Sequence, residues 1–290
     1  MTTLIGIEAH RFASRRLTRA LALFLVLGFL TAGAIAFAKS NRDMAGAVER
    51  ARSEALADYN ECVGVPGAKA AFCEAPDLDQ VTADPRWHLT DAIPVSQGVS
   101  AFLIILALAA GASFAGADWH HRVIATTLTW EPRRGRVIVA KVLGAALVTV
   151  AGVVVLELLF VGTMTPAAVW RGTTAGVSSA WLGDLFGTIV RGAATAGMGA
   201  AIGCAVAMVG RATAAALGLL FAWTAVVENA IRGGIPGWRR WLIGDNAGAF
   251  ITWSDPEFVR SGLTAGLLLL AYTALTVAVS SRVFARRDIA

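Results

Sequence analysis

Long runs of apolar residues without charge dominate the pattern along the chain. A helix needs about 20 such residues to cross the roughly 30 Å hydrocarbon core of a bilayer. Helices are expected in these runs because lipid offers backbone amides no hydrogen-bond partner. The pattern therefore predicts an all-α polytopic membrane protein with six transmembrane helices. The predicted helices cover residues 20–38, 99–117, 137–162, 185–209, 212–230 and 262–281.

The composition agrees with that pattern. Apolar residues make up 56% of the 290 residues and charged residues 16%, whereas ordinary soluble chains have about 45–50% and about 25%. This balance argues against a soluble enzyme and a disordered chain. The excess of basic residues flanks apolar runs, which is typical of membrane topology signals rather than nucleic-acid binding. The sequence thus predicts contact with a lipid bilayer and no nucleic-acid partner.

The distribution of Lys and Arg predicts that both termini are cytoplasmic. With the N-terminus inside, the inner segments carry Lys and Arg at more than twice the density of the outer segments, as the positive-inside rule requires. Ala36-Phe37-Ala38 resembles a signal-peptidase site. The apolar run before it is longer than a usual signal core, which favours a retained span.

The N-terminal residues 1–19 have the pattern of an amphipathic interfacial helix. Glu8, Arg11 and Arg15 fall on one stripe, and Phe12 falls on the neighbouring apolar stripe. Two interpretations stay open: a positive anchor, or an elbow helix that contacts a cytoplasmic partner.

The segment 39–98 is predicted to be a small polar outer domain. It contains Cys62 and Cys73, and outside the cytoplasm a disulfide between them is the favoured state. His88 is the sole imidazole nearby, so no metal site is expected. The third cysteine, Cys204, lies inside a predicted span and is expected to be a packing residue.

The segment 118–136 forms the one large inner loop. Val123, Leu128 and Trp130 alternate with polar residues, which predicts a short helix along the membrane surface. This apolar and aromatic content exceeds what a loop that only fixes topology needs. It favours docking onto another protein. The basic residues that follow, up to Lys141, are expected to reach the lipid headgroups.

Motifs for catalysis or nucleotide binding are missing from the sequence. No lysine stands in a phosphate-binding Gly-x-x-x-x-Gly-Lys-Ser/Thr loop, and neither Gly-x-Ser-x-Gly nor His-Glu-x-x-His occurs. The sequence therefore predicts no catalytic residue, metal or cofactor of its own.

Two charged residues lie within predicted spans. Glu157 and Arg191 are costly in lipid and could pair with each other, for a functional or a structural purpose. Gly199 and Gly203, four residues apart, favour close helix packing. Gly, Pro, Trp and Arg in the outer segment 231–261 indicate an interfacial anchor or a re-entrant segment.

The inner loop also carries a family resemblance. Asp118 follows a span of small residues, the stretch 127–134 reads TLTWEPRR, and Lys141 stands at the foot of the next span. Arg211 opens the fifth span, Glu228 ends it, and 284–289 (FARRDI) closes the chain. Together these features resemble type-two ABC transporter permeases, the membrane subunits of ABC exporters. The family more often has Glu at the position of Asp118.

The resemblance implies a bacterial plasma-membrane permease that works as a homo- or heterodimer. ATP and Mg would be bound by a separate cytoplasmic ABC ATPase subunit, and force would pass through the loop after the second span. It implies coupling contacts at Val123, Leu128, Trp130 and Glu131, electrostatic partners at Arg122 and Arg133, and an ion pair of Asp118 with Arg11 or Arg15. The alternatives are a membrane-embedded enzyme and a membrane anchor or sensor with an extracytoplasmic binding domain.

Overall fold

The computed structural model describes residues 1–40, 43–64, 73, 75–78, 84 and 86–286. The described chain is helical and contains no β-strand, which confirms the predicted all-α class. Within it, six helical segments are long and apolar enough to cross a membrane. These segments are Arg16–Lys39, Leu89–His120, Arg134–Arg171, Ser179–Gly210, Thr213–Gly234 and Gly262–Arg286.

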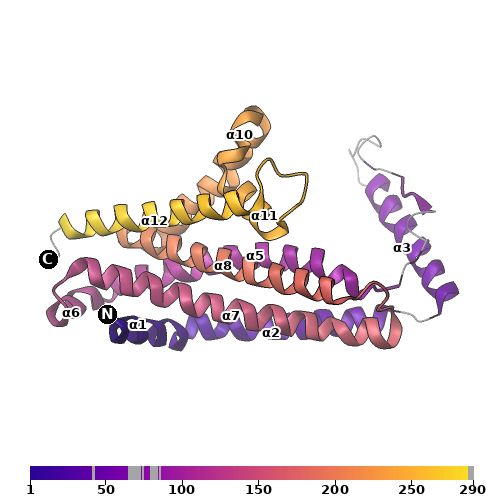
Figure 1. The fold of residues 1–290 in the computed structure, drawn as a ribbon, viewed down its shortest axis with the longest axis horizontal. Coiled ribbons are helices and arrows are strands. Elements are labelled where there is room, and N and C mark those ends of the chain that lie inside the picture. Colours follow the sequence, from indigo (N-terminus) through magenta and orange to yellow (C-terminus); the bar gives the residue numbers. More distant parts are fainter. Residues whose placement is uncertain (41–42, 65–72, 74, 79–83, 85, 287–290) are drawn as a thin grey trace. The chain divides into compact units, whose positions relative to one another are not determined.

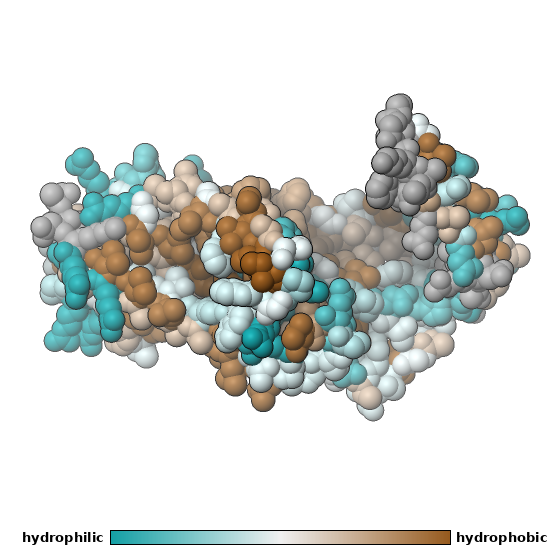
Figure 2. All heavy atoms as spheres, turned by 90° about the horizontal axis from the view of Figure 1, so that it is seen from above, coloured by the Kyte–Doolittle hydropathy of each residue, from teal (hydrophilic) through white to brown (hydrophobic). Residues whose placement is uncertain are grey.

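The chain divides into two compact units (Figure 1). Unit 1 comprises Met1–Val26, Ile93–Leu158 and Gly183–Ala290. Unit 2 comprises Leu27–Ala92 and Leu159–Leu182. Figure 2 shows hydrophilic side chains gathered at the end of unit 1 that holds the short helix α6, with apolar side chains next to them. This pattern is expected of a helix bundle whose sides face lipid.

The N-terminal segment forms a short helix rather than one helix over 1–19. α1 spans Thr2–Ser14 and α2 spans Arg16–Lys39. Arg15 between them has extended backbone, with ψ 142°. Phe12 is 2% exposed near the end of α1. This buried side chain anchors α1 in the core of unit 1, and the chain then turns into α2.

Three helices follow one another around the predicted inner loop. α5 spans Ala92–His120, α6 spans Val123–Trp130 and α7 spans Arg134–Arg171. Arg122 has φ 55°, the left-handed conformation that non-glycine residues adopt rarely. This residue sets the turn from α5 into α6. The short helix is therefore present, and residues 118–120 and 134–136 of the predicted loop belong to α5 and α7.

Small residues let α8, Ser179–Gly210, approach α5 closely. A Cβ on Gly203 would lie 2.1 Å from the carbonyl oxygen of Leu108, and one on Gly199 would lie 3.3 Å from that of Ile104. Gly111 of α5 makes the reciprocal approach to Ala200. The two helix backbones therefore pack at a distance that larger residues would not allow.

The fifth span is interrupted before the chain turns back. α9 spans Thr213–Phe221, a π-helical segment spans Ala222–Val227 and α10 spans Glu228–Gly234. A 3-10 turn, Pro236–Trp241, then leads into α11, Ile243–Thr252. α11 packs against α12, Gly262–Arg286, as Figure 1 shows. Within 231–261 the structure thus forms short helices that return toward the bundle.

In unit 2 the helix α3 spans Met44–Gly64, and η2 spans Leu89–Asp91. The predicted disulfide between Cys62 and Cys73 is confirmed. Residues 41–42, 65–72, 74, 79–83 and 85 of the predicted outer domain lie outside the described residues.

The third helix is longer than the predicted span 137–162, because α7 continues through Pro166 to Arg171. Its extension is buried at Ala167 and Ala168, and Ala168 packs against Leu89 and Ala92. Only 172–178 of the predicted loop 163–184 connect α7 to α8. Pro166 removes one helical hydrogen bond, and the helix nevertheless continues past it.

Candidate functional site

A network of four charged side chains lies where α1, α5 and α7 meet. Nζ of Lys141 on α7 contacts the carboxylates of Glu8, at 2.8 Å, and of Asp118. Arg11 donates to Glu8 at 2.8 Å and to both oxygens of Asp118 at 3.0 and 3.1 Å. The expected ion pair between Asp118 and the N-terminal helix is therefore present, with Arg11. Two of the four side chains, Glu8 and Arg11, belong to α1, so the network ties α1 to α5 and α7.

Burial makes this network consequential for stability. The side chain of Lys141 is 1% exposed and that of Glu8 2%. Two acids and two bases balance their charges. Each acid contacts both bases, and each base contacts both acids. Removing one member of such a buried group leaves an uncompensated charge, which is strongly destabilising.

Aromatic rings surround the same network. Nζ of Lys141 lies 4.3 Å from the ring centroid of Phe114, and the guanidinium of Arg15 lies 5.5 Å from it. Phe12 packs edge-on against Phe114 with centroids 5.2 Å apart. Burial lowers the pKa of Arg15 from its ordinary value. Arg15 thus contributes a cation–π contact, while Arg11 makes the ion pair.

The short helix α6 rests on the apolar cluster next to this network. Ile124 is 2% exposed and belongs to the cluster, and Leu128, one turn later, packs against its edge. The cluster draws residues from six other helices, α1, α5, α7, α8, α9 and α12, among them Phe12, Phe114, Ile138, Met208 and Phe284. The position of α6 is therefore fixed by side chains from most of unit 1.

The opposite side of α6 is open. Trp130 is 87% exposed, and Arg122 and Arg133 at the two ends are exposed as well. Glu131 is half-buried; its carboxylate contacts Arg136 at 3.5 Å and accepts from the backbone N–H of Arg133. Trp130 has the highest exposed fraction among the large apolar side chains of the described residues.

The predicted coupling residues thus separate into two sets. Trp130, Arg122 and Arg133 are exposed, whereas Val123 is half-buried and Leu128 faces the cluster. Lys141, expected at the lipid headgroups, is instead buried in the ion network, because two carboxylates compensate its charge there.

Glu157 and Arg191 form no ion pair in the described structure, which corrects the predicted intramembrane pair. Glu157 of α7 accepts a hydrogen bond from Ser100 and faces Gly192 of α8. Arg191 donates to the carbonyl oxygen of Ile251 at 3.1 Å. The reason is helix geometry: neighbouring residues point about 100° apart, so when Gly192 faces Glu157, Arg191 is directed elsewhere.

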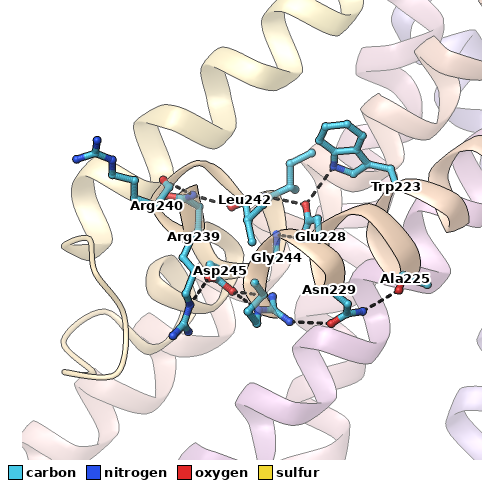
Figure 3. Close-up of polar contacts among 12 residues, drawn as sticks. Trp223, Ala225, Glu228, Asn229, Arg239, Arg240, Leu242, Gly244 and Asp245 are labelled. Atoms are coloured by element: carbon cyan, nitrogen blue, oxygen red, sulfur yellow. Dashed lines mark hydrogen bonds and ion pairs between the residues drawn. The ribbon is translucent and has the colours of Figure 1, made fainter. Parts of the chain in front are cut away.

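A second polar cluster joins α10 to α11 (Figure 3). The carboxylate of Glu228 accepts from Nε1 of Trp223 at 3.1 Å and from the backbone N–H groups of Ile243 and Gly244 at 2.8 and 2.9 Å. These amides begin α11, whose N-terminus favours a negative charge. Glu228 therefore fixes the start of the returning helix.

The same cluster contains a second carboxylate with two cations. Asp245 accepts from Arg232 at 2.6 Å and from Arg239 at 3.1 Å. These contacts tie α10 and the 3-10 turn to α11.

A cavity of about 740 Å³ lies beside Glu228 in unit 1. It has the size and the apolar lining that are typical of ligand-binding cavities, about 300–1,000 Å³. Its walls come from α5, from α9 with the π-helical segment, and from α11; they include Ile104, Leu108, Phe221, Thr224 and Ile251. π-helical turns are frequent at functional sites.

Sequence reasoning did not assign a site role to Glu8, Ser100 or Asp245. The signal for Glu8 was available: Lys141 at the foot of an apolar run requires a counter-charge. Asp245 and Ser100 carried no such signal, because their partners lie on other elements and meet them only in the folded chain. The sequence matches no model of a known protein family and no curated protein.

Proposed function

We propose that this chain is the membrane-spanning permease subunit of an ABC exporter, driven by a separate cytoplasmic ATPase subunit that binds ATP and Mg. The single observation that carries the proposal is Trp130, an 87% exposed indole at the end of a short helix that is itself anchored in the core. In this proposal α6 is the docking element and lies on the cytoplasmic side. The resemblance of 118–141 to type-two ABC permeases supports the same role.

The packing of α6 suits the transmission of force. A partner that moves α6 would push on Ile124 and Leu128, and through them on the cluster shared with α5, α7, α8 and α12. The ion network of Glu8, Arg11, Asp118 and Lys141 ties α1 to the same place. Movement of α6 would therefore reach several spans rather than a single one.

The cavity beside Glu228 provides the substrate path in this proposal. It is largely apolar and lined by the second and fifth spans. A second permease subunit, from the same or another chain, would complete the path.

The test compares Trp130→Ala with the unmodified protein. It measures how much of the candidate ATPase co-purifies with each and how strongly each stimulates ATP hydrolysis. Truncation of a buried interface tryptophan commonly costs about 2 kcal/mol or more of binding free energy, so affinity should fall about 30-fold, since 1.4 kcal/mol is tenfold. Glu131→Arg should reduce binding more than Glu131→Gln, because reversal adds repulsion against a basic partner. All three variants should stay folded, because neither side chain is buried.

Trp238→Ala is the matched control, since Trp238 is also exposed, at 61%, but lies in the turn before α11. It should bind and stimulate the ATPase as the unmodified protein does. If Trp130→Ala and both Glu131 variants bind and stimulate normally, α6 is not the coupling element. The membrane anchor or sensor would then be the better interpretation.

A further inference from the structure

A carboxylate without a counter-charge is buried between α5, α7 and α8. Glu157 is 0% exposed. Its Oε1 accepts a hydrogen bond from Oγ of Ser100 at 2.6 Å. Its Oε2 has no hydrogen-bond partner among the described residues. Buried polar atoms in proteins nearly always have a partner, so an orphaned carboxylate oxygen needs an explanation.

A second buried oxygen without a partner lies on α5, one helical turn from Ser100. Ser96 is 0% exposed, and its Oγ also has no partner within the described part of the chain. Ser96 and Ser100 are four residues apart on α5, so they project from the same face of that helix. One face of α5 therefore carries Ser96 and Ser100, and Ser100 contacts Glu157 of α7. All three are fully buried.

No cation of the described chain neutralises this group. α5 presents serines to it, and α8 presents Gly192. The neighbouring Arg191 directs its guanidinium to Ile251 and Thr188 instead. On α7 itself the buried residues one turn to each side are Val153 and Phe160. An isolated carboxylate in such surroundings is very costly unless a positive charge joins it.

Gly192 keeps space beside the carboxylate. A Cβ at this position would lie 2.1 Å from Oγ of Ser100 and 3.0 Å from Oε1 of Glu157. Any other residue would push into the hydrogen bond between these two side chains. The absence of a side chain on α8 therefore preserves the arrangement of oxygens.

We propose that Glu157, Ser96 and Ser100 form a buried site for a small monovalent cation, Na⁺ or a proton. The carboxylate supplies the negative charge and the serine hydroxyls supply neutral oxygens, which hard cations prefer as ligands. The site lies beyond the proposed function, because a permease driven by a partner ATPase needs no ion on its own chain. Binding of the ion would favour the packing of α5, α7 and α8 seen here.

The experiment uses the full-length protein in detergent, without any ATPase, and follows thermal unfolding. In one arm Na⁺ replaces choline at constant ionic strength and pH. In the other arm pH is varied in choline alone. A site for Na⁺ raises the unfolding midpoint as Na⁺ increases, until saturation. A proton site leaves the Na⁺ arm flat, and the midpoint falls as pH rises because the folded state then loses its proton.

Three variants identify the site. Glu157→Gln should abolish the response that the unmodified protein shows, since Gln carries no charge. Ser96→Ala should weaken it several-fold without loss of folding, because it removes a hydroxyl that has no described partner. Ser280→Ala is the matched control: Ser280 is equally buried, but its hydroxyl donates to the carbonyl oxygen of Ala205 in another part of unit 1. It should keep the full response.

The proposal is overturned if the unmodified protein and Glu157→Gln respond alike in both arms. It is also overturned if Ser96→Ala and Ser280→Ala change the response equally. Should Glu157→Gln not fold, the comparison of the two serine variants decides. Failure here leaves the docking of α6 untouched, because no ATPase is present in the measurement.

Discussion

Two buried groups of ionisable side chains in unit 1 are built in opposite ways. At the junction of α1, α5 and α7, Glu8 and Asp118 face Lys141 and Arg11, so that two negative charges meet two positive charges. Between α5, α7 and α8, Glu157 receives one neutral hydroxyl and no cation. Glu8, Lys141 and Glu157 are at most 2% exposed, whereas the side chain of Arg11 is 30% exposed.

The difference teaches how a buried charge can be interpreted. In a balanced network every charge is compensated by an opposite charge. Such a network holds α1, α5 and α7 in fixed positions next to α6. The buried carboxylate of Glu157 has no opposite charge beside it within the described residues, and the cation proposed above would supply one. Burial alone does not separate the two cases; the number of partner charges does.

The largest expected effect comes from breaking the balanced network with Lys141→Met. Glu8 and Asp118 would then share only Arg11, and loss of one partner from a buried ion pair typically costs about 3–5 kcal/mol. The free energy of unfolding should fall by that order, as measured by denaturation in mixed detergent. Asp118→Asn added to Lys141→Met should restore part of the loss, because it removes the surplus negative charge.

Lys39→Met is the matched control for this prediction. Nζ of Lys39 pairs with Glu54 at 3.3 Å, but both side chains are more than half exposed. Exposed pairs contribute about 0–1 kcal/mol, so stability should barely change. Equal losses for Lys141→Met and Lys39→Met would contradict the distinction between the network and the surface.

A smaller effect is expected where the unbalanced carboxylate meets α8. Gly192→Ala places a methyl group against Ser100 and Glu157. Overpacking of this kind costs about 1–3 kcal/mol, and thermal unfolding in detergent should report the loss. Gly152→Ala on α7 is the control, since a Cβ there has no atom within 4 Å. If Gly192→Ala unfolded at the same temperature as the unmodified protein, the prediction would be wrong. α5 and α8 could then move apart at Gly192 without loss of stability.

The smallest effect is expected at a partly exposed ion pair, Asp84 and Arg86. A hydrogen bond from Arg86 lowers the pKa of Asp84 to about 2. Because the folded pKa is depressed below the ordinary value, the stabilisation is present above about pH 4 and is lost as pH falls toward 2. NMR titration of the Asp84 carboxyl should show this midpoint, and Arg86→Gln should move it back toward the ordinary value. An unchanged midpoint in Arg86→Gln would contradict the assigned cause.

Much of the fold could be predicted from the sequence, because a membrane span depends on the hydrophobicity summed over one continuous segment. Six apolar runs of sufficient length predict six spans, and the structure has six such helices. Helix ends were predicted less well: α7 runs on to Arg171, where Ala168 packs against Leu89 and Ala92. A packing partner 76 or 79 residues away in the chain leaves no trace in a local hydropathy pattern.

The candidate sites show the same division. The short helix α6 and its exposed Trp130 follow from a local pattern of apolar and polar residues. The pairing of Lys141 with Glu8 does not, since these residues are separated by 133 positions. Nor could the sequence separate Glu157 from Arg191, since both lie at similar depths of neighbouring spans.

The sequence by itself thus determined that the chain is helical, that six of its segments can cross a membrane, and that Cys62 and Cys73 can pair. The tertiary structure alone decided which buried charges meet. The physical reason is that hydrophobicity adds up along a segment, whereas the partner of a side chain depends on the rotation of its helix. One residue changes that direction by about 100°, which is why Gly192, and not Arg191, faces Glu157.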